Sequence, residues 1–482
     1  MGVVFNTETI VAVATALSDS GIGIVRISGP EAIEIADKVF CTKSGKRKLK
    51  NVDSHTIHYG YIVDCKDENE ILSEGWQDCI IDEVMVAVMR APKSYTMEDT
   101  VEINCHGGVL VMQKILETVL KHGARLAQPG EFTKRAFLNG RIDLSKAEAV
   151  IDVIHSQNEF ALQSSMNQLQ GNLSKEVKSL REEIIYEIAF IESALDDPEH
   201  ISLDGYKDKL DEKVSNLSDR VNKLIFTADN GRLMKEGIST VIVGKPNAGK
   251  SSLLNIMVGE ERAIVTDIAG TTRDVLQESI KLHGIGLNII DTAGIRTTED
   301  VVEKIGVEKA KKYANEADLI LYVVDASVAL DDSDREIITL LEDKNDIILL
   351  NKSDLTAAVE ESDLIQVIDE LVPGHKKIEM IRTSTKDNTG IDEFENTIKE
   401  MFFKGNLKNN NQIVITNMRH KEALQNAYDS LQMVRRSLMD DMPDDFYSID
   451  LMSAYSSLGF IIGEEVDDDL VNEIFTKFCM GK

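Results

Sequence analysis

The residues best suited to chemistry form one glycine-rich stretch, Gly244-Lys-Pro-Asn-Ala-Gly-Lys-Ser251, with the spacing G-x-x-x-x-G-K-[ST]. Glycines let backbone N–H groups close on a phosphate, and a helix N-terminus adds partial positive charge. We expect Lys250 to reach the outer phosphates of a nucleotide and the Ser251 hydroxyl to bind Mg²⁺. Because residues 240–243 are apolar and residues 252–257 suit a helix, the sequence predicts a strand, a phosphate-binding turn and a helix.

A second motif indicates which base is bound. The stretch Ile347-Ile-Leu-Leu-Asn-Lys-Ser-Asp354 is an apolar strand followed by N-K-x-D. The Asp354 carboxylate can accept hydrogen bonds from the ring N–H and the amino group of guanine, which adenine does not offer in that arrangement. Asn351 and Lys352 would brace the base. Thr383-Ser-Thr-Lys386 falls where another base-contacting loop is expected, so the sequence favours GTP over ATP.

Two further stretches suit the metal ion and the γ-phosphate. Ile289-Ile-Asp-Thr-Ala-Gly294 is an apolar strand followed by D-T-A-G. Asp291 can act on Mg²⁺ through water, and the N–H of Gly294 can face the γ-phosphate. Between the motifs, Gly270-Thr-Thr-Arg-Asp274 has the composition of a switch, in which Thr272 would be a second ligand of Mg²⁺. Together these motifs make a chance match of the first one negligible.

The residue after D-T-A-G separates this switch from that of Ras-like proteins, which place a glutamine there to orient the attacking water. Here the residue is Ile295, so another group must position the water. Arg273 and Arg296 are either arginine fingers or ordinary exposed side chains of the switch. The side-chain oxygen of Asn247 could bind a monovalent cation beside the phosphates.

Length and composition limit the classes of protein. A chain of 482 residues corresponds to about three domains, and 43% hydrophobic residues suffice for packed cores. The net charge of −30 predicts no general basic face for nucleic acid, although a local patch or a partner can still contact RNA. The five cysteines lack metal-ligand spacing and are odd in number. Without an apolar leader or membrane segment, the sequence predicts a soluble cytoplasmic protein with reduced thiols.

The elements that position these motifs change in type along the chain. Up to about residue 140 the pattern is mixed, with strands expected at 9–14, 23–28, 55–63, 82–89 and 101–105 and helices at 31–40 and 109–121. Helical spacing follows through residues 144–170, 177–195 and 207–232, and it returns at 420–439 and 471–478. Helices on both sides of the nucleotide motifs suggest one helical domain with a nucleotide-binding domain inserted in it. Two separate helical bundles would give the same pattern.

The chain resembles the MnmE family of tRNA modification GTPases, also called TrmE, of the TrmE-Era-EngA-like GTPase group. The resemblance covers nearly the whole length. It rests on the stretches 9–12, 23–29, 95–99, 105–108, 129–139, 244–255 and 263–274 and on the terminal Phe478-Cys-Met-Gly-Lys482, the C-x-G-K ending of the family.

The resemblance implies a multidomain α/β fold. Residues 1–140 would form an N-terminal α/β domain that binds tetrahydrofolate and dimerises. Residues 141–236 and 404–482 would form the helical domain, the second part ending in the Cys-Met-Gly-Lys motif. Residues 237–403 would form a Ras-like P-loop G domain inserted between them.

The resemblance also implies an activity and partners. Members act with the flavoprotein MnmG, the only source of FAD, in a heterotetramer-type complex. Together they modify carbon 5 of the wobble uridine of certain tRNAs to a carboxymethylaminomethyl-type or aminomethyl-type uridine. A 5-formyl- or 5,10-methylenetetrahydrofolate supplies the one-carbon unit. The homodimer pairs its G domains with K⁺ and Mg²⁺ bound, and GTP hydrolysis drives opening and closing.

Site residues are carried over by position. Asn247 with the backbone of Thr266, Ile268 and Thr271 corresponds to the potassium site, and Ser251 and Thr272 to the magnesium ligands. Glu303 corresponds to the glutamate that orients the water, Cys479 to the cysteine proposed to act in modification, and Lys250 to the phosphate-binding lysine. Folate contacts fall on Arg26, Glu102, Arg141 and Lys482. The GTP-binding set is Asn247, Ala248, Gly249, Lys250, Ser251, Ser252, Thr266, Asp267, Ile268, Ala269, Gly270, Thr271, Thr272, Asp291, Thr292, Ala293, Gly294, Asn351, Lys352, Ser353, Asp354, Ser384, Thr385 and Lys386.

Two other classes compete with this interpretation. One is a ribosome-assembly GTPase of the Era or EngA type, which lacks the N-terminal domain and the C-terminal cysteine motif. The other is a regulatory switch protein with no part in modification. The chain also departs from the family after its first strand, where Ala16-Leu-Ser-Asp-Ser20 replaces a loop rich in proline and glycine.

Overall fold

The computed structural model describes residues 8–44, 46, 49–64, 76–156, 158–197, 199–200, 205–260, 278–282, 285–290, 313–342, 344–375, 378–403, 413–478 and 481. The chain forms two compact units. The first comprises Met1–Ile151, Leu169–Glu182 and Tyr455–Lys482, and the second comprises Asp152–Gln168 and Glu183–Ala454. The domain limits expected at residues 140, 236 and 403 stay predictions.

The first unit is built on a seven-stranded sheet in the order β3-β4-β5-β6-β2-β1-β7. Neighbouring strands are antiparallel except β1 and β7, which are parallel. The strands are β1 (Ile10–Val13), β2 (Ser20–Ser28), β3 (Phe40–Cys41), β4 (Thr56–Val63), β5 (Ile80–Met89), β6 (Thr100–Gly107) and β7 (Arg125–Leu126). The strands expected in this part of the sequence are therefore confirmed.

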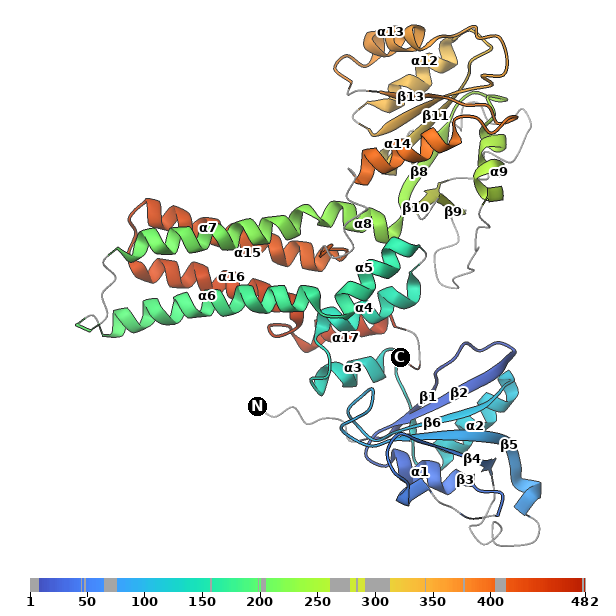
Figure 1. Cartoon of the computed structure of the whole chain (residues 1–482), viewed down its shortest axis with the longest axis vertical. Coiled ribbons are helices and arrows are strands. Elements are labelled where there is room, and N and C mark those ends of the chain that lie inside the picture. The colour runs from blue at the N-terminus through green and yellow to red at the C-terminus, as the bar shows by residue number, and fades with distance from the viewer. Residues whose placement is uncertain are drawn as a thin grey trace. The chain divides into compact units, whose positions relative to one another are not determined.

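Helices α1 (Ala32–Val39) and α2 (Val109–Lys121) bury their apolar sides against this sheet (Figure 1). On β6, Val101, Ile103 and Cys105 belong to that core, so the alternating residue Glu102 belongs to the opposite face. Short 3₁₀ turns lie at Leu49–Asn51 and Trp76–Cys79.

The same unit includes helices from both ends of the chain. They are α3 (Glu131–Leu138), α4 (Leu144–His155) and α17 (Asp468–Thr476). Phe475 and Phe478 share a core cluster with Leu144 and Ala147. Gly130 has a left-handed φ of 70°, and a Cβ there would lie 2.5 Å from the carbonyl oxygen of Phe475. The end of the chain therefore packs closely on the start of α3.

The second unit contains a six-stranded sheet in the order β13-β12-β11-β8-β10-β9. Strands β13, β12, β11, β8 and β10 run parallel, and β9 is antiparallel to β10. The strands are β8 (Ile238–Val243), β9 (Glu278–Leu282), β10 (Ile285–Ile289), β11 (Leu319–Asp325), β12 (Asp346–Asn351) and β13 (Glu379–Arg382). Parallel strands bring their carboxyl ends to one edge, where ligands bind in sheets of this type.

Helices cover both faces of this sheet, as the almost continuous burial of β11 and β12 requires. One core joins Leu253, Met257 and Phe394 to the strands, and the other joins Ile338 and Leu364 to them. The covering helices are α9 (Lys250–Glu260), α12 (Asp332–Ile338), α13 (Glu361–Leu371) and α14 (Ile391–Phe403), with a 3₁₀ turn at Thr339–Leu341.

Long helices precede and follow this sheet and its covering helices, which correspond to the G domain expected at residues 237–403. They are α5 (Glu159–Leu169), α6 (Asn172–Asp196), α7 (Tyr206–Phe226), α8 (Ala228–Glu236), α15 (Met418–Met439) and α16 (Asp444–Ile462). Helix α7, from before the G domain, packs along α15, from after it (Figure 1). At this contact Arg435 Nε donates to Asp211 Oδ1 at 3.0 Å. The G domain is therefore inserted in one helical domain, as the sequence suggests.

Two predicted helical segments are wrong in detail. The segment 144–170 is divided, because α4 ends at His155 and α5 begins at Glu159. The segment 207–232 is not continuous, because α7 ends at Phe226 and α8 begins at Ala228. The hydroxyl of Thr227 donates to the carbonyl of Leu224 at 2.7 Å and accepts from the amide of Ile415 at 3.1 Å. This side chain thus connects the break between α7 and α8 to the segment that precedes α15. Among the described helices, none is both long and apolar enough to cross a membrane.

Candidate functional site

The phosphate loop connects β8 to α9 as predicted. Gly244 has a φ of 149°, and a Cβ there would lie 2.3 Å from the carbonyl oxygen of Val323, so the loop depends on glycine where it passes β11. Lys250 Nζ donates to the carbonyl oxygens of Gly244 at 2.6 Å and Lys245 at 2.7 Å. Burial lowers the pKa of Lys250 from its ordinary value. The ammonium group of Lys250 is thus held against the first two residues of the loop.

The base-reading motif lies at the same edge of the sheet. Strand β12 ends at Asn351, which pairs in register with Asp325, the last residue of β11. Asn351 Nδ2 donates to the carbonyl oxygen of Ala248 at 2.8 Å, and the amide of Thr385 donates to Asn351 Oδ1 at 3.4 Å. Asn351 is 1% exposed. A single buried amide therefore joins the phosphate loop, the N-K-x-D motif and the loop after β13.

The expected guanine acceptor is held by this third loop. Ser384 Oγ donates to Asp354 Oδ1 at 3.2 Å, and Lys386 Nζ lies 3.9 Å from Asp354 Oδ2. Lys352 has a left-handed φ of 62°, and its Nζ lies 2.6 Å from Asp325 Oδ2. The side chain of Asp354 is 18% exposed, so its carboxylate can accept hydrogen bonds from a ligand.

The remaining predictions for this site divide into two groups. Asn247, with a left-handed φ of 63°, is exposed on the loop, and Ser251 and Ser252 are exposed in the first turn of α9. The other group lies outside the described residues: Thr266, Asp267, Ile268, Ala269, Gly270, Thr271, Thr272, Arg273, Asp291, Thr292, Ala293, Gly294, Ile295, Arg296 and Glu303.

A second predicted cluster lies in the first unit. Arg26 on β2 pairs in register with Glu102 on β6, and Arg26 Nε donates to Glu102 Oε1 at 2.8 Å. The guanidinium of Arg26 lies 5.7 Å and that of Arg141 lies 4.8 Å from the ring centre of Tyr95. Arg26 Nη1 donates to the carbonyl oxygen of Gly481 at 3.1 Å. Three of the four predicted folate contacts therefore converge. Lys482 and Cys479 lie outside the described residues.

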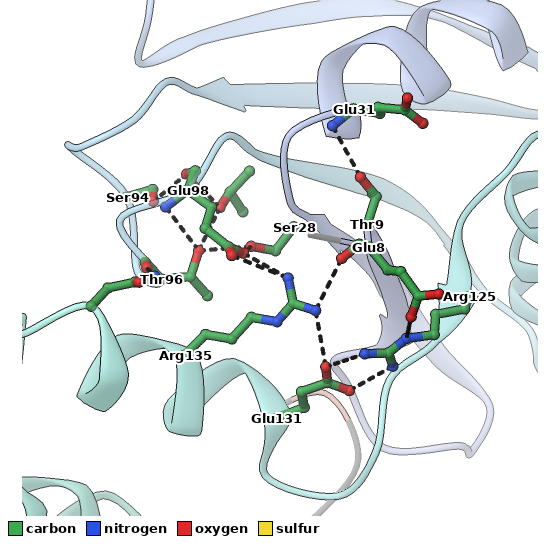
Figure 2. A network of polar contacts seen from close by, with 12 residues as sticks. Glu8, Thr9, Ser28, Glu31, Ser94, Thr96, Glu98, Arg125, Glu131 and Arg135 are labelled. Carbon is green, nitrogen blue, oxygen red and sulfur yellow. Dashed lines mark hydrogen bonds and ion pairs between the residues drawn. The ribbon is translucent and has the colours of Figure 1, made fainter. Parts of the chain in front are cut away.

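A buried network of charges lies beside this cluster (Figure 2). Figure 2 shows Arg135 between Glu98 and Glu131, with Nη1 3.0 Å from Glu98 Oε2 and Nη2 2.9 Å from Glu131 Oε1. Arg125 approaches Glu131 from the other side, at 2.6 Å. Burial opposes ionisation of Glu131, but the hydrogen bonds from Arg125, the Gln128 backbone and Arg135 outweigh it and lower the pKa to about 2. The network borders a cleft of about 780 Å³ that Phe475 also lines.

Comparison with known proteins gives a consistent result over the whole chain. The family model "GTP-binding protein TrmE N-terminus" matches residues 9–141, and the model "MnmE helical domain" matches residues 144–479. A protein of Lachnoclostridium phytofermentans named tRNA modification GTPase MnmE is 58% identical over 99% of this chain and all of its own length. Proteins of the same name from Clostridioides difficile and Acetivibrio thermocellus are 48% and 47% identical, with the same coverage. The chain belongs to the MnmE family of tRNA modification GTPases.

Membership in the MnmE family accounts for the insertion seen in the fold. The match to the MnmE helical model begins at α4, includes the G domain and extends past α17. The TrmE N-terminal match spans the sheet that carries Arg26 and Glu102 and ends at Arg141.

Several residues around these sites were not predicted from the sequence. Tyr95 lies between two of the predicted arginines, Asp325 holds Lys352, and Lys245 makes ion pairs outside the phosphate loop. Tyr95 stands in a stretch that carries the MnmE resemblance, which could have identified it. Asp325 is the polar end of an otherwise apolar strand, a position that marks the carboxyl edge of a parallel sheet.

Proposed function

We propose that this MnmE-family GTPase binds guanine nucleotides between the phosphate loop, Asn351 and Asp354. The observation that carries the proposal is the hydrogen bond from Asn351 to Ala248, because it joins a phosphate-binding loop to a base-reading loop. The backbone N–H groups at the start of α9 would bind the phosphates, with Lys250 beside them. Asp354 would accept from guanine and disfavour adenine.

The proposed chemistry is hydrolysis of GTP with Mg²⁺ and K⁺ bound. Ser251 and Thr272 would hold Mg²⁺, and Asn247 with the backbone of the switch would hold K⁺. Asn247 fits this role because it is exposed on the loop that cradles the phosphates. Bound K⁺ supplies positive charge beside the transferring phosphoryl group. Glu303 would orient the attacking water, a task that Ile295 cannot perform.

The N-terminal cluster is proposed to bind a reduced folate. Among the described residues, contacts to the Glu102 side chain use only Oε1, so Oε2 can accept from the N–H groups of a pterin. Arg141 can meet a carboxylate of the folate tail. The ring of Tyr95, which both guanidinium groups already approach, adds an apolar surface.

The proposed cellular role is modification of the wobble uridine at carbon 5, with the flavoprotein MnmG as partner of a homodimer. The folate would supply the one-carbon unit, and Cys479 is a proposed participant. Nucleoside analysis of tRNA from cells lacking this protein tests the role. We expect loss of carboxymethylaminomethyl-type or aminomethyl-type uridine and its return with the native gene. Unchanged wobble uridines would contradict the proposal and favour a ribosome-assembly role.

A further inference from the structure

The side chain of Lys245 links the phosphate loop to helix α12. Lys245 is the second residue of the loop, and its side chain is 17% exposed. Its Nζ lies 2.6 Å from Asp334 Oδ2 and 3.0 Å from Asp331 Oδ2. Both aspartates lie at the start of α12, outside the nucleotide motifs. The G-x-x-x-x-G-K-[ST] pattern allows any residue at the position of Lys245. In this chain that residue nevertheless forms ion pairs with two aspartates.

Asp334 is a buried carboxylate whose described contacts all come from hydrogen-bond donors or from a cation. Its side chain is 1% exposed. Its Oδ1 accepts from the hydroxyl of Tyr322 at 2.8 Å, and its Oδ2 accepts from the amide of Asp331 at 2.9 Å. Tyr322 is itself fully buried on β11. A buried charge in such surroundings costs free energy unless it is paired, and Lys245 is the cation that pairs it.

The backbone of Lys245 connects this anchor to the phosphate-binding lysine. The carbonyl oxygen of Lys245 accepts from Lys250 Nζ at 2.7 Å and from the amide of Ala248 at 3.3 Å. Holding the Lys245 side chain on α12 therefore fixes the carbonyl that directs Lys250. Two donors of the Lys250 ammonium point to Gly244 and Lys245, and the remaining donor is left for a phosphate oxygen.

We propose that Lys245 and Asp334 are positioning residues for phosphate binding, acting through the carbonyl of Lys245 on Lys250. The inference rests on the proposed binding of guanine nucleotides and assigns a role to residues outside its motifs. The Tyr322 hydroxyl and the capping box of α12 hold Asp334 in place. Breaking the pair therefore weakens contacts to the phosphates much more than contacts to the base, because Lys250 bonds the Lys245 carbonyl directly, whereas Asn351 is linked to it only through Ala248.

The test compares ligands with and without phosphates on the full-length chain. Calorimetry gives the Kd for GDP, and ligand-observed NMR gives the Kd for guanosine. We expect Lys245→Met and Asp334→Asn to weaken GDP binding by about tenfold and to leave guanosine binding within about twofold. Lys245→Arg keeps the charge and should restore most of the affinity. Glu370→Gln is the matched control. It removes an exposed ion pair between Glu370 on α13 and Arg335, which lies on α12 next to Asp334.

Each outcome decides between explanations. Native GDP affinity in both Lys245→Met and Asp334→Asn overturns the inference, and so does an equal loss for GDP and guanosine, which indicates general damage. If Asp334→Asn does not fold, Lys245→Met alone decides, since its side chain is partly exposed. A native chain that binds no GDP contradicts the proposed nucleotide function instead.

Discussion

Asn351 donates a hydrogen bond from Nδ2 to the carbonyl oxygen of Ala248 at 2.8 Å. The amide of Asn351 can approach this closely because Gly249 has no side chain. Gly249 has a φ of 102°, and a Cβ there would lie 2.0 Å from Asn351 Nδ2. The glycine before Lys250 is therefore needed for contact between loops as well as for backbone conformation. The two halves of the nucleotide site are coupled at this point.

Gly249→Ala should weaken GDP binding by at least about tenfold, because the new methyl group displaces the Asn351 amide from Ala248. Calorimetry measures the Kd. Gly374→Ala is the control: its φ is 91°, but nothing lies within 4 Å of a Cβ there. Both substitutions strain a left-handed backbone, and only Gly249→Ala creates the contact. Equal GDP affinity in the two variants would show that the Asn351–Ala248 bond does not set affinity.

Asp354→Asn should change the base preference from guanine to xanthine, because an amide can donate to the additional carbonyl of xanthine where the carboxylate only accepts. We expect GTP affinity to fall by at least about a hundredfold and XTP affinity to rise. Competition against a fluorescent GDP analogue measures both. Asp387→Asn, an exposed acid two residues beyond Thr385, should leave the preference unchanged. A variant that still prefers GTP would refute the assignment of Asp354.

The nucleotide motifs and the Lys245–Asp334 pair differ in how far the sequence could predict them. Lys250, Asn351 and Asp354 each follow an apolar run, and parallel strands necessarily bring such positions to one edge. The Lys245–Asp334 pair depends on where α12 returns after β11, which no local pattern encodes. The break at Thr227 was not predicted, and one of the contacts made there, from the amide of Ile415, comes from a residue far away in the chain.

The cluster of Arg26, Glu102 and Arg141 shows the same limit. Its residues Arg26 and Glu102 were placed by resemblance, and the register of β2 with β6 brings them together. The stacking of both arginines near Tyr95 depends on the loop between β5 and β6. Strand periodicity predicts which face a residue belongs to, but not which loop side chain covers it.

Acid should destabilise the first unit through Glu131. Since its pKa is about 2 in the folded chain against an ordinary 4.5, the stabilisation is present above pH 4.5 and is lost as pH falls toward 2. Glu131→Gln should lower the urea midpoint at pH 7, and the gap to the native protein should narrow below pH 4.5. Hydrogen exchange of peptides from β1 and β6, followed at increasing urea, reports this unit.

The control for this prediction is Glu34→Gln. Glu34 pairs with Lys50 on the surface, where both side chains are 51% exposed, so its loss should change the midpoint little at any pH. A Glu131→Gln protein with the native midpoint at pH 7, or a gap that widens on acidification, would contradict the role of the network.

Arg26→Met should weaken binding of 5-formyltetrahydrofolate by at least about tenfold, because it removes the partner that orients Glu102. Glu102→Gln should have a similar effect by replacing an acceptor of the pterin N–H groups. Calorimetry on the full-length protein measures both. Lys121→Met, which removes an exposed ion pair with Asp64, should bind as the native protein does. No binding by the native protein would exclude the folate site.

Hydrolysis of GTP should be faster in K⁺ than in Na⁺ at equal ionic strength, because the smaller ion requires shorter ligand distances than a site built for K⁺ offers. Asn247→Ala should bring the ratio of the two rates close to ~1, since the side-chain oxygen expected to hold the cation is gone. Asn388→Ala is the matched control, because Asn388 is also an exposed asparagine with a left-handed φ, 55° against 63° for Asn247.

The Glu303→Ala variant tests whether Glu303 orients the attacking water without contributing to nucleotide binding. It should lower kcat by about a hundredfold or more while the Kd for GTP stays near native, the pattern of an interaction made mainly in the transition state. A residual K⁺ stimulation in this variant is expected, because the cation and the glutamate would act on different atoms. Equal native rates in K⁺ and Na⁺ would refute the cation mechanism, and native turnover in Glu303→Ala would refute the role of the glutamate.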